Sequence, residues 1–286
     1  MTGKNGGKRF FLFFFCALFS IFTHSRAAYA IDAGPLLRIW DEFSRAPAYR
    51  EERCERVYEI FSRLGGDKII VESVEDGGGD ACPGNVMLTG PGKRTDLIVI
   101  TAHLDSFEKG TGSLDDFSGI LMMAALFEGL KQYSLNHTIL FVAFDKEEVG
   151  LIGSRSFLSK RPDIYETIHA SVNLECLGLT LPRAWSEGSS DALEEILISV
   201  GKTNGEDLAS VSIPNVGADS LSFLDYGIPA ITIIGILPEH LTFIDSARDT
   251  PDIVDREIFF RSYEILLQYI LELDRLHYSV GVENER

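Results

Sequence analysis

Apolar and polar positions fall into blocks along the chain that predict buried strands separated by amphipathic helices. Short, continuous apolar runs predict strands at 97–101, 138–144, 171–174 and 230–236. Apolar residues at helical spacing predict helices at 36–64, 118–131, 147–159 and 191–204, and a long final helix with apolar positions from Phe259 to Leu273. Strands without polar alternation, set between helices, indicate a mostly parallel sheet covered on both faces. We therefore predict an α/β fold, a three-layer α/β/α sandwich around a mostly parallel, mixed sheet.

Titratable side chains follow each predicted strand. In order they are His103 and Asp105, then Asp115 and Asp116 before the next helix, Glu147 and Glu148, Glu175, and finally His240, Asp245 and Asp249. Taken singly, each group is typical of a surface turn or a helix start. Ligands of such folds bind beyond the carboxyl ends of the strands, so joint placement there predicts one shared site. Clustered carboxylates and an imidazole are suitable ligands for divalent metals.

Composition and charge narrow the classes of partner. The 286 residues are 45% apolar and 24% charged, with a formal net charge of −17. This is a globular composition, and its acidic balance argues against binding to nucleic acid or to anionic lipid. Cys54 could pair with Cys82 and leave Cys176 free, or all three could be buried thiols.

Six stretches between residues 100 and 255 carry a family resemblance. They are AHLDS (102–106), LDDFSG (114–119), AFDKEEVGLIGS (143–154), NLECLG (173–178), ADSLSFLDYGIPAIT (218–232) and DSARDTPDIVD (245–255). The chain resembles the co-catalytic zinc aminopeptidases of the bacterial leucyl-aminopeptidase type, relatives of aminopeptidase Y and glutaminyl cyclase. The E-E-x-G-L-x-G-S segment and the spacing from H-x-D to D-D-x-S-G are the specific features. The resemblance implies a zinc-exopeptidase-like fold and a single catalytic domain over residues 31–286.

The resemblance also implies a role for each matching residue. Glu147 is the implied general base and acid. The implied metal ligands are His103, Asp115, Glu148, Glu175 and Asp245, with Asp115 bridging two ions. The remaining assignments are Asp105 and Asp116 as supporting carboxylates around the ligands, and Asp219 and Phe223 as substrate-binding residues. Core packing is an equal alternative for Phe223, and Asp249 receives no ligand role.

Two positions depart from the family pattern. Glu175 stands where the family usually has Asp, and Asp245 stands where the last ligand is normally His. Carboxylate can ligate zinc, so we expect two divalent ions, zinc by resemblance. The oxygen-rich donor set also admits manganese or magnesium. His240 could replace Asp245 if the loop shifted, but an exposed loop histidine is the favoured interpretation.

The function implied is that of an exported metallo-aminopeptidase. A water shared by the two ions would attack the peptide carbonyl, and Glu147 would pass its proton to the leaving amine. The acidic rim suits a peptide substrate with a free α-ammonium group. Two alternatives stay open: a glutaminyl-peptide cyclase with one zinc, and an inactive scaffold that binds a peptide or partner, for which Asp245 is the main support. The substrate side chain and the oligomeric state are not predicted.

The N-terminus predicts export. Lys4, Lys8 and Arg9 precede an apolar run at 10–22, and Ala28-Tyr29-Ala30 fits a cleavage site. This is the pattern of a secretory signal peptide over residues 1–30, with an uncleaved anchor as the alternative. We expect a periplasmic or secreted protein without membrane contact after cleavage.

Overall fold

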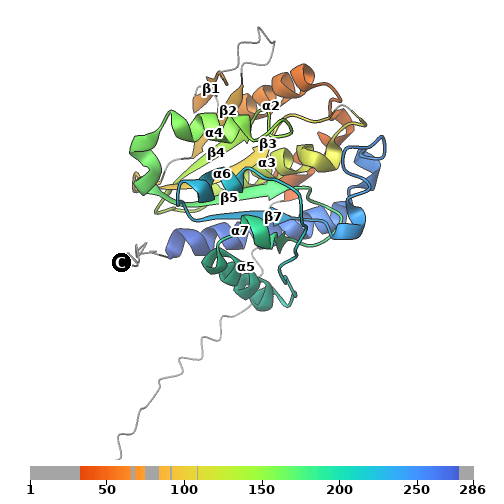
Figure 1. The fold of residues 1–286 in the computed structure, drawn as a ribbon. Helices are drawn as coiled ribbons and strands as arrows, with labels where there is room; N and C mark the ends of the chain where they lie inside the picture. Colours follow the sequence, from red (N-terminus) through yellow and green to blue (C-terminus); the bar gives the residue numbers. More distant parts are fainter. Residues whose placement is uncertain (1–32, 66–67, 75–83, 91, 108, 277–286) are drawn as a thin grey trace, which may run out of the picture. The chain divides into compact units, whose positions relative to one another are not determined.

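A seven-stranded sheet forms the centre of the computed structural model, which describes residues 33–65, 68–74, 84–90, 92–107 and 109–276 (Figure 1). The strands are β1 (Ile69–Glu72), β2 (Asn85–Gly90), β3 (Leu97–His103), β4 (Thr138–Phe144), β5 (Ile168–Glu175), β6 (Arg183–Ala184) and β7 (Ala230–Ile234), in the spatial order β1-β2-β4-β3-β5-β7-β6. The neighbouring strands β4, β3, β5 and β7 are parallel. At the two sides of this core, β2 pairs antiparallel with β4 and β6 pairs antiparallel with β7, and β1 pairs antiparallel with β2. The predicted mixed sheet is confirmed, and its parallel part is the central one.

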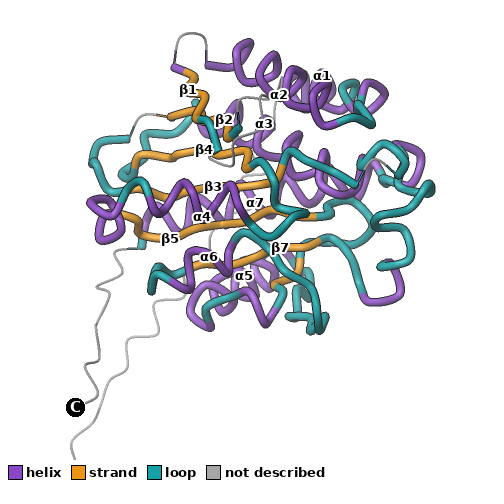
Figure 2. The backbone as a smooth tube through the Cα atoms, turned by 45° about the horizontal axis from the view of Figure 1, so that its top comes forward, coloured by secondary structure: helices purple, strands orange, loops and turns teal. Residues whose placement is uncertain are grey.

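Helices cover both faces of the sheet. They are α1 (Ala33–Trp40), α2 (Arg50–Gly65), α3 (Ser118–Leu130), α4 (Ile152–Ser159), α5 (Asp191–Asn204), α6 (Ser220–Asp225) and α7 (Arg256–Arg275). Helix α3 packs on β3 and β5 and is itself contacted by α1, α2 and α7, while α5 packs against α7. Helices α4 and α6 contact each other on the opposite face (Figures 1 and 2). The three-layer architecture is therefore confirmed.

Burial explains the composition of the central elements. Nearly every residue of α3 is buried, because this helix lies between the sheet and three other helices. Its sequence is accordingly apolar on all sides rather than along one stripe. On the other face, Phe144 of β4, Phe157 of α4 and Phe223 of α6 pack into one apolar cluster. The strands read as continuous apolar runs for the same reason, since both of their faces are covered.

Two predicted helices begin or end differently in the structure. The predicted helix at 36–64 is interrupted between Trp40 and Arg50 by a short turn at Phe43–Arg45 and extended backbone at Ala46, next to Pro47. A proline disfavours helical backbone in the residue before it. The predicted helix at 147–159 begins only at Ile152, because the backbone before it includes left-handed φ angles, with Gly150 at 112°. Glu147 and Glu148 consequently lie in a loop.

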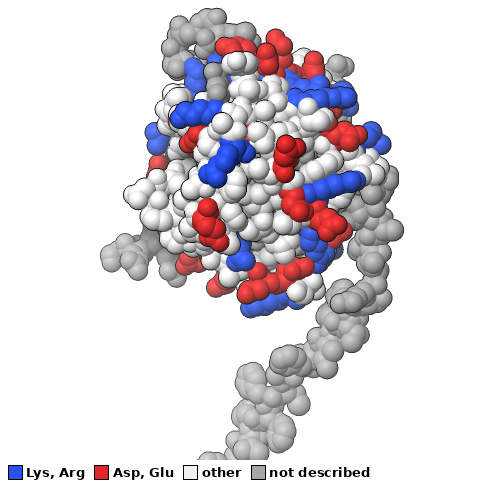
Figure 3. Space-filling model, turned by 90° about the vertical axis from the view of Figure 1, so that its right-hand side faces the viewer, with Lys and Arg blue, Asp and Glu red and all other residues white. Residues whose placement is uncertain are grey.

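Several expectations fall on parts of the chain that the structure does not describe. The signal peptide at 1–30 lies there, as does Cys82. Cys54 is disulfide-bonded, and Cys176 is a free, buried thiol. Among the described residues, every helix is either too short or too polar to cross a bilayer. Acidic and basic side chains are interspersed over the face shown in Figure 3.

Asp274 fastens the end of α7 to the start of β4. One of its oxygens accepts hydrogen bonds from the backbone N–H of Asn136 at 2.9 Å and of His137 at 2.8 Å, and the other accepts from Asn136 at 3.0 Å. The His137 ring lies 3.2 Å from the same carboxylate. Asp274 is buried, so its loss would leave buried donors without an acceptor.

We expect Asp274→Ala to lower the free energy of unfolding by about 2–4 kcal/mol, because the backbone donors of Asn136 and His137 would stay unpaired. Urea denaturation measures this change. Glu272→Ala is the matched control on the same helix turn, since Glu272 is only partly buried and forms a surface ion pair of 3.7 Å with the exposed Arg275, and we expect a change within about 0.5 kcal/mol. Equal stability of the two variants would contradict the anchoring role.

Candidate metal centre

The parallel strands bring the predicted site residues to one edge of the sheet. His103 is the last residue of β3, and Glu175 is the last residue of the adjacent strand β5. Glu147 and Glu148 follow the end of β4, which pairs with β3 on its other side so that His103 lies opposite Phe144. The carboxyl ends of these strands coincide, so side chains distant in sequence meet there.

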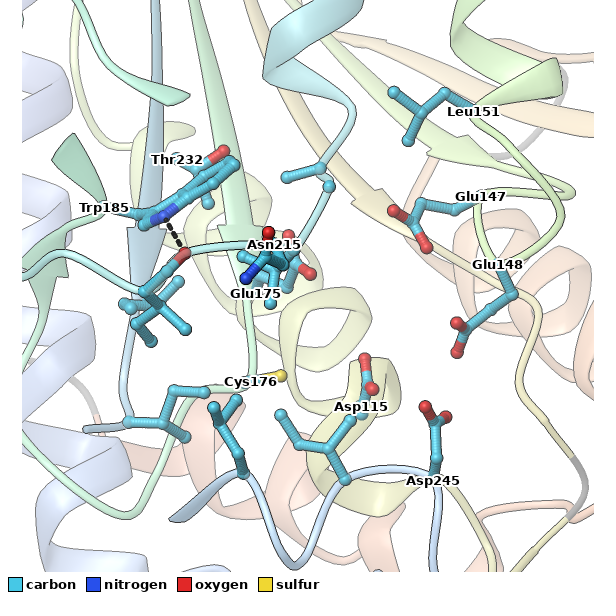
Figure 4. Close-up of a pocket in the computed structure, with 18 of the residues that line it drawn as sticks. Asp115, Glu147, Glu148, Leu151, Glu175, Cys176, Trp185, Asn215, Thr232 and Asp245 are labelled. Atoms are coloured by element: carbon cyan, nitrogen blue, oxygen red, sulfur yellow. Dashed lines mark hydrogen bonds between the residues drawn. The ribbon is translucent and has the colours of Figure 1, made fainter. Parts of the chain in front are cut away.

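The five predicted ligands fall into two groups of donor atoms that share Asp115, and a third group joins His103 and Glu148 to Glu147. The donor atoms of His103, Asp115 and Glu175 lie within 4.8 Å of one another, as do those of Asp115, Glu148 and Asp245. Figure 4 shows Asp115, Glu148 and Asp245 extending into a common space. Asp115 belongs to both groups, and Nε2 of His103 lies 2.9 Å from its Oδ1. If each group held one ion, Asp115 would be the residue that the two ions share.

The electrostatics of this cluster fit divalent cations. Burial, with Glu175, Asp219 and Asp115 nearby, raises the pKa of Glu147 to about 10. Burial and Asp115 likewise raise the pKa of Glu148 to about 9. One oxygen of Glu148 is buried without a hydrogen-bond partner among the described residues. Carboxylates this close repel one another when ionised, and a cation removes that repulsion. The donor set of one imidazole and four carboxylates therefore suits zinc, manganese or magnesium.

Asp105 connects the histidine ligand to the loop that carries Glu147 and Glu148. Its two carboxylate oxygens accept hydrogen bonds from the backbone N–H of Glu147 at 3.0 Å and of Glu148 at 3.2 Å. Its Oδ1 lies 3.6 Å from Nδ1 of His103, and its backbone oxygen lies 3.2 Å from the same nitrogen. Burial by itself would raise the pKa of Asp105. The contact with His103 and the backbone hydrogen bonds outweigh burial, so the pKa of Asp105 lies below its ordinary value. These contacts place Asp105 where it could orient His103, and that role stays a prediction.

Asp116 and Asp249 hold backbone rather than facing the pocket. Asp116 is fully buried and accepts hydrogen bonds from the backbone N–H of His103 at 3.3 Å, Gly119 at 3.0 Å and Cys176 at 3.1 Å. It thereby ties β3, α3 and the end of β5 together. Burial raises the pKa of Asp116 to about 8. It belongs to neither of the two donor groups.

Asp249 supports the backbone of the bridging residue. Its oxygens accept from the N–H of Leu114 at 2.7 Å and of Asp115 at 3.1 Å. The sequence assigned Asp249 no ligand role, and the structure gives it a supporting one. In the sequence, the signal for the supporting role of Asp249 is its position four residues after Asp245. The contact itself could not be predicted locally, because it joins segments that are 134 residues apart.

A pocket of about 390 Å³ opens at the metal centre and has two chemically different sides. The acidic side consists of Glu147 and the four carboxylates among the predicted ligands, namely Asp115, Glu148, Glu175 and Asp245. The apolar side is lined by Trp185, which Figure 4 shows, and by Ile213, Val216, Ile234, Ile236, Leu241 and Ile244. Trp185 is held in place by a hydrogen bond of 3.1 Å from its indole N–H to the carbonyl oxygen of Ile213. The segment 213–218 carries no sequence motif that predicted this lining.

The structure corrects the predicted substrate contacts. Phe223 is fully buried and packs against Phe144 and Phe157, with ring centroids 6.2 and 6.3 Å away, so it is a core residue. Asp219 is also fully buried and is absent from the pocket lining. Asp219 precedes the short helix α6 and Phe223 lies within it, and the sequence pattern did not predict this helix.

His240 does not replace Asp245. Its Nδ1 accepts a hydrogen bond of 3.0 Å from the backbone N–H of Leu237 within its own turn. It belongs to none of the candidate metal groups among the described residues. The structure thus favours Asp245, whose backbone has a left-handed φ of 52°, as the last predicted ligand.

Comparisons with known proteins agree with this geometry. The sequence profile of peptidase family M28 matches residues 85–270. Aminopeptidase YwaD of Bacillus subtilis is 28% identical over 149 residues, which are 46% of this chain and 32% of the relative. The chain spans less than half the length of the curated relatives that it matches first.

Solved structures share the fold. Legionella pneumophila LapA aminopeptidase superposes with a TM-score of 0.73 at 16% identity, over 85% of this chain and 72% of that one. An Acidobacteriales bacterium glutaminyl cyclase superposes with a TM-score of 0.70 at 18% identity, over 84% and 94%. The matched profile covers more than half of the chain and contains the residues of the metal centre from His103 to Asp245. The chain therefore belongs to peptidase family M28.

Proposed function

We propose that this chain is a metal-dependent aminopeptidase that removes the N-terminal residue from peptides. The observation that carries the proposal is the pair of donor groups sharing Asp115 in a pocket that Glu147 also lines. Membership of a peptidase family supports peptide hydrolysis, and the relatives named as aminopeptidases support action at the N-terminus. Export is part of the proposal and is supported by the signal-like pattern at residues 1–30.

Two divalent ions at this centre would supply Lewis acidity for the scissile carbonyl and lower the pKa of water. The chain itself supplies the proton transfer. Glu147 lies with Glu148 and His103 in one cluster of donor atoms, so its carboxylate faces the reaction space. It would accept the proton of the attacking water and donate it to the leaving amine. Cations nearby would lower its raised pKa toward the range that a base requires.

The two sides of the pocket suggest how a substrate would lie. The carboxylates would hold the positively charged α-ammonium group of the peptide, which restricts cleavage to the first bond. The apolar side would receive the side chain of the N-terminal residue, with Trp185 as a rigid wall. We therefore propose a preference for large apolar N-terminal residues.

Glutaminyl cyclisation is the second candidate. The observation that favours it is the likeness in fold and length to a glutaminyl cyclase, 94% of which is covered. The two donor groups favour the hydrolase, since a cyclase of the kind anticipated from sequence would use one zinc. A peptide that begins with glutamine separates the two, because hydrolysis releases free glutamine and cyclisation leaves a pyroglutamyl peptide.

We expect Glu147→Gln to reduce kcat for peptide hydrolysis by about 100-fold or more, because the amide cannot accept the proton of the attacking water. The measurement is hydrolysis of leucine p-nitroanilide together with metal content by elemental mass spectrometry. Metal content and circular dichroism should match those of the wild type. Retention of more than half of the activity would show that Glu147 is not the base.

We expect metal affinity to rise with pH between about pH 6 and pH 9, because a metal ion must displace protons from carboxyl groups with raised pKa values, such as Glu148. The same protons stabilise the metal-free fold. Since the folded state holds protons that the unfolded state has lost, stability of the metal-free protein should fall as pH rises over this window. Calorimetric titration with Zn²⁺ and thermal melts at several pH values measure both effects. Affinity independent of pH would argue against these carboxylates as ligands.

We expect leucine and phenylalanine p-nitroanilides to be cleaved with kcat/KM about 10-fold or more above alanine p-nitroanilide, because burial of a larger apolar side chain contributes roughly 1–3 kcal/mol. The glutamate compound should be poorer still, since its charge would enter the apolar side. N-acetyl-leucine p-nitroanilide is the control, and it should resist cleavage because it lacks the α-ammonium group. Cleavage of the acetylated compound would contradict the exopeptidase proposal.

A further inference from the structure

Two arginines of α2 reach the loops that carry the metal centre. Arg50 is the first residue of α2 and Arg53 is the fourth, so the two side chains lie on the same face of the helix. The helix lies outside the segment matched by the family profile, 85–270. From the sequence it was only a charged amphipathic helix, and the mechanism proposed above does not use it.

Arg53 joins both ends of the segment that separates His103 from Asp115. Its Nε donates to the carbonyl oxygen of Leu104 at 2.8 Å, and Leu104 directly follows His103. Its Nη1 donates to the carbonyl oxygens of Thr111 at 3.0 Å and Gly112 at 2.9 Å, three residues before Asp115. One planar guanidinium therefore sets the distance between the two ends of this segment.

The surroundings of Arg53 are built around the guanidinium. The side chain is fully buried, and its guanidinium carbon lies 5.5 Å from the centre of the Phe117 ring. Gly112 has a left-handed φ of 54°, and a Cβ at this position would lie 2.4 Å from Nη1 of Arg53. A side chain at residue 112 would thus displace the guanidinium. Burial lowers the pKa of Arg53, whereas Asp116, Asp105, Asp115 and Asp249 raise it and favour the charged form.

Arg50 makes the corresponding contact with the loop after β4. Its Nε and Nη2 donate to the two oxygens of Asp145, at 2.8 and 2.5 Å. Asp145 is fully buried, follows the last residue of β4, and lies two residues before Glu147. Its backbone N–H donates to the side chain of Asn85 on β2 at 3.0 Å. The start of the Glu147–Glu148 loop is therefore held from two sides.

Stability alone does not account for this pair. Burying a charged guanidinium is costly, and apolar replacements of buried ionic groups are often neutral or stabilising. A positive charge in the first turn of a helix, as at Arg50, also opposes the helix dipole. Departures of this kind from ordinary folding preferences are expected where they serve a functional site.

We propose that Arg53 and Arg50 are positioning residues that hold the two ligand-bearing loops at the separation required for metal binding. Arg53 acts on the His103–Asp115 segment, and Arg50 acts on the loop of Glu147 and Glu148. Neither touches the substrate or the donor atoms of the centre. The proposal rests on the proposed function only in that the centre binds divalent ions.

The test compares Arg53→Lys with Arg63→Lys in the full chain. Lysine keeps the positive charge of residue 53, but its single ammonium group cannot reproduce the planar fork that reaches both loop ends. Arg63 is the matched control, because it lies on the same helix, is partly exposed, and bonds Glu42 at 2.9 Å, far along the chain from the centre. Two quantities are measured, namely hydrogen–deuterium exchange of the segment 109–117 in metal-free protein and the affinity for Zn²⁺ by calorimetric titration.

We expect Arg53→Lys to accelerate exchange at 109–117 and to weaken Zn²⁺ affinity by roughly 10-fold or more, as for other residues that support metal ligands. Arg63→Lys should change neither quantity. Exchange and affinity equal to those of the control would overturn the proposal, because charge alone would then suffice. Faster exchange with unchanged affinity would also overturn it. Absence of Zn²⁺ binding in the wild type would instead overturn the proposed function, while the exchange comparison would still decide the role of Arg53 on its loop.

Arg50→Lys provides a second variant should Arg53→Lys fail to fold. A lysine at residue 50 keeps an ion pair with Asp145 but loses the two-point contact, so faster exchange should appear at 145–150 and not at 109–117. Zn²⁺ affinity should again fall by roughly 10-fold. Exchange that increases equally throughout the protein would show a general loss of stability and would overturn the positioning role.

Discussion

The concentration of carboxylates at one edge of a buried sheet is the constraint on which the rest of this structure depends. Nine carboxylates gather at this edge together with the imidazole of His103. They are Asp105, Asp115, Asp116, Glu147, Glu148, Glu175, Asp219, Asp245 and Asp249. Ionised groups at these separations and with this burial repel strongly, so each must be hydrogen-bonded, protonated or neutralised by a cation. Some of these carboxylates are hydrogen-bonded and others are not, and this difference separates their proposed roles.

Hydrogen bonding separates the supporting carboxylates from the ligands. Asp105, Asp116 and Asp249 accept bonds from backbone N–H groups of β3, α3 and the loops around the centre. These three carboxylates therefore hold the backbone of those segments in place. Glu148, by contrast, keeps a buried oxygen without a partner among the described residues, and Asp115 faces both donor groups. Free lone pairs that point to one space are what metal ligands need. With Glu175 and Asp245 as predicted ligands, the donor set would contain one nitrogen among oxygens, which would suit harder ions as well as zinc.

The guanidinium groups of Arg53 and Arg50 add positive charge near the carboxylates, besides the metal ions expected at the centre. Arg53 is buried, interacts with the charges of four aspartates and donates to backbone carbonyl groups, so its charge offsets some of the repulsion without lining the pocket. Arg50 does the same for Asp145 at the neighbouring strand end. Helix α2 is thereby coupled to the centre, although it contributes no residue to the pocket lining. The apolar side of the pocket comes from Trp185, β7 and the segments at 213–218 and 241–244, and the last of these leads directly to the predicted ligand Asp245.

Local sequence determined the strands β3, β4 and β7, the helices α3, α5 and α7 and the order of the chemical groups, because burial on both faces leaves continuous apolar runs and because each ligand follows a strand end. Local sequence did not determine where the helix before Pro47 breaks. It also did not determine that Glu147 and Glu148 lie in a loop, because left-handed backbone at several positions decided that.

The larger limit of the sequence concerns contacts between distant segments, as Phe223, Trp185, Asp249 and Arg53 show. Whether Phe223 faces the core or the pocket, whether Trp185 lies on the surface or forms a wall, and which loops Asp249 and Arg53 hold all depend on contacts between segments far apart in the chain. The period of the sequence encodes which side of an element is buried, but only tertiary packing decides what that side meets.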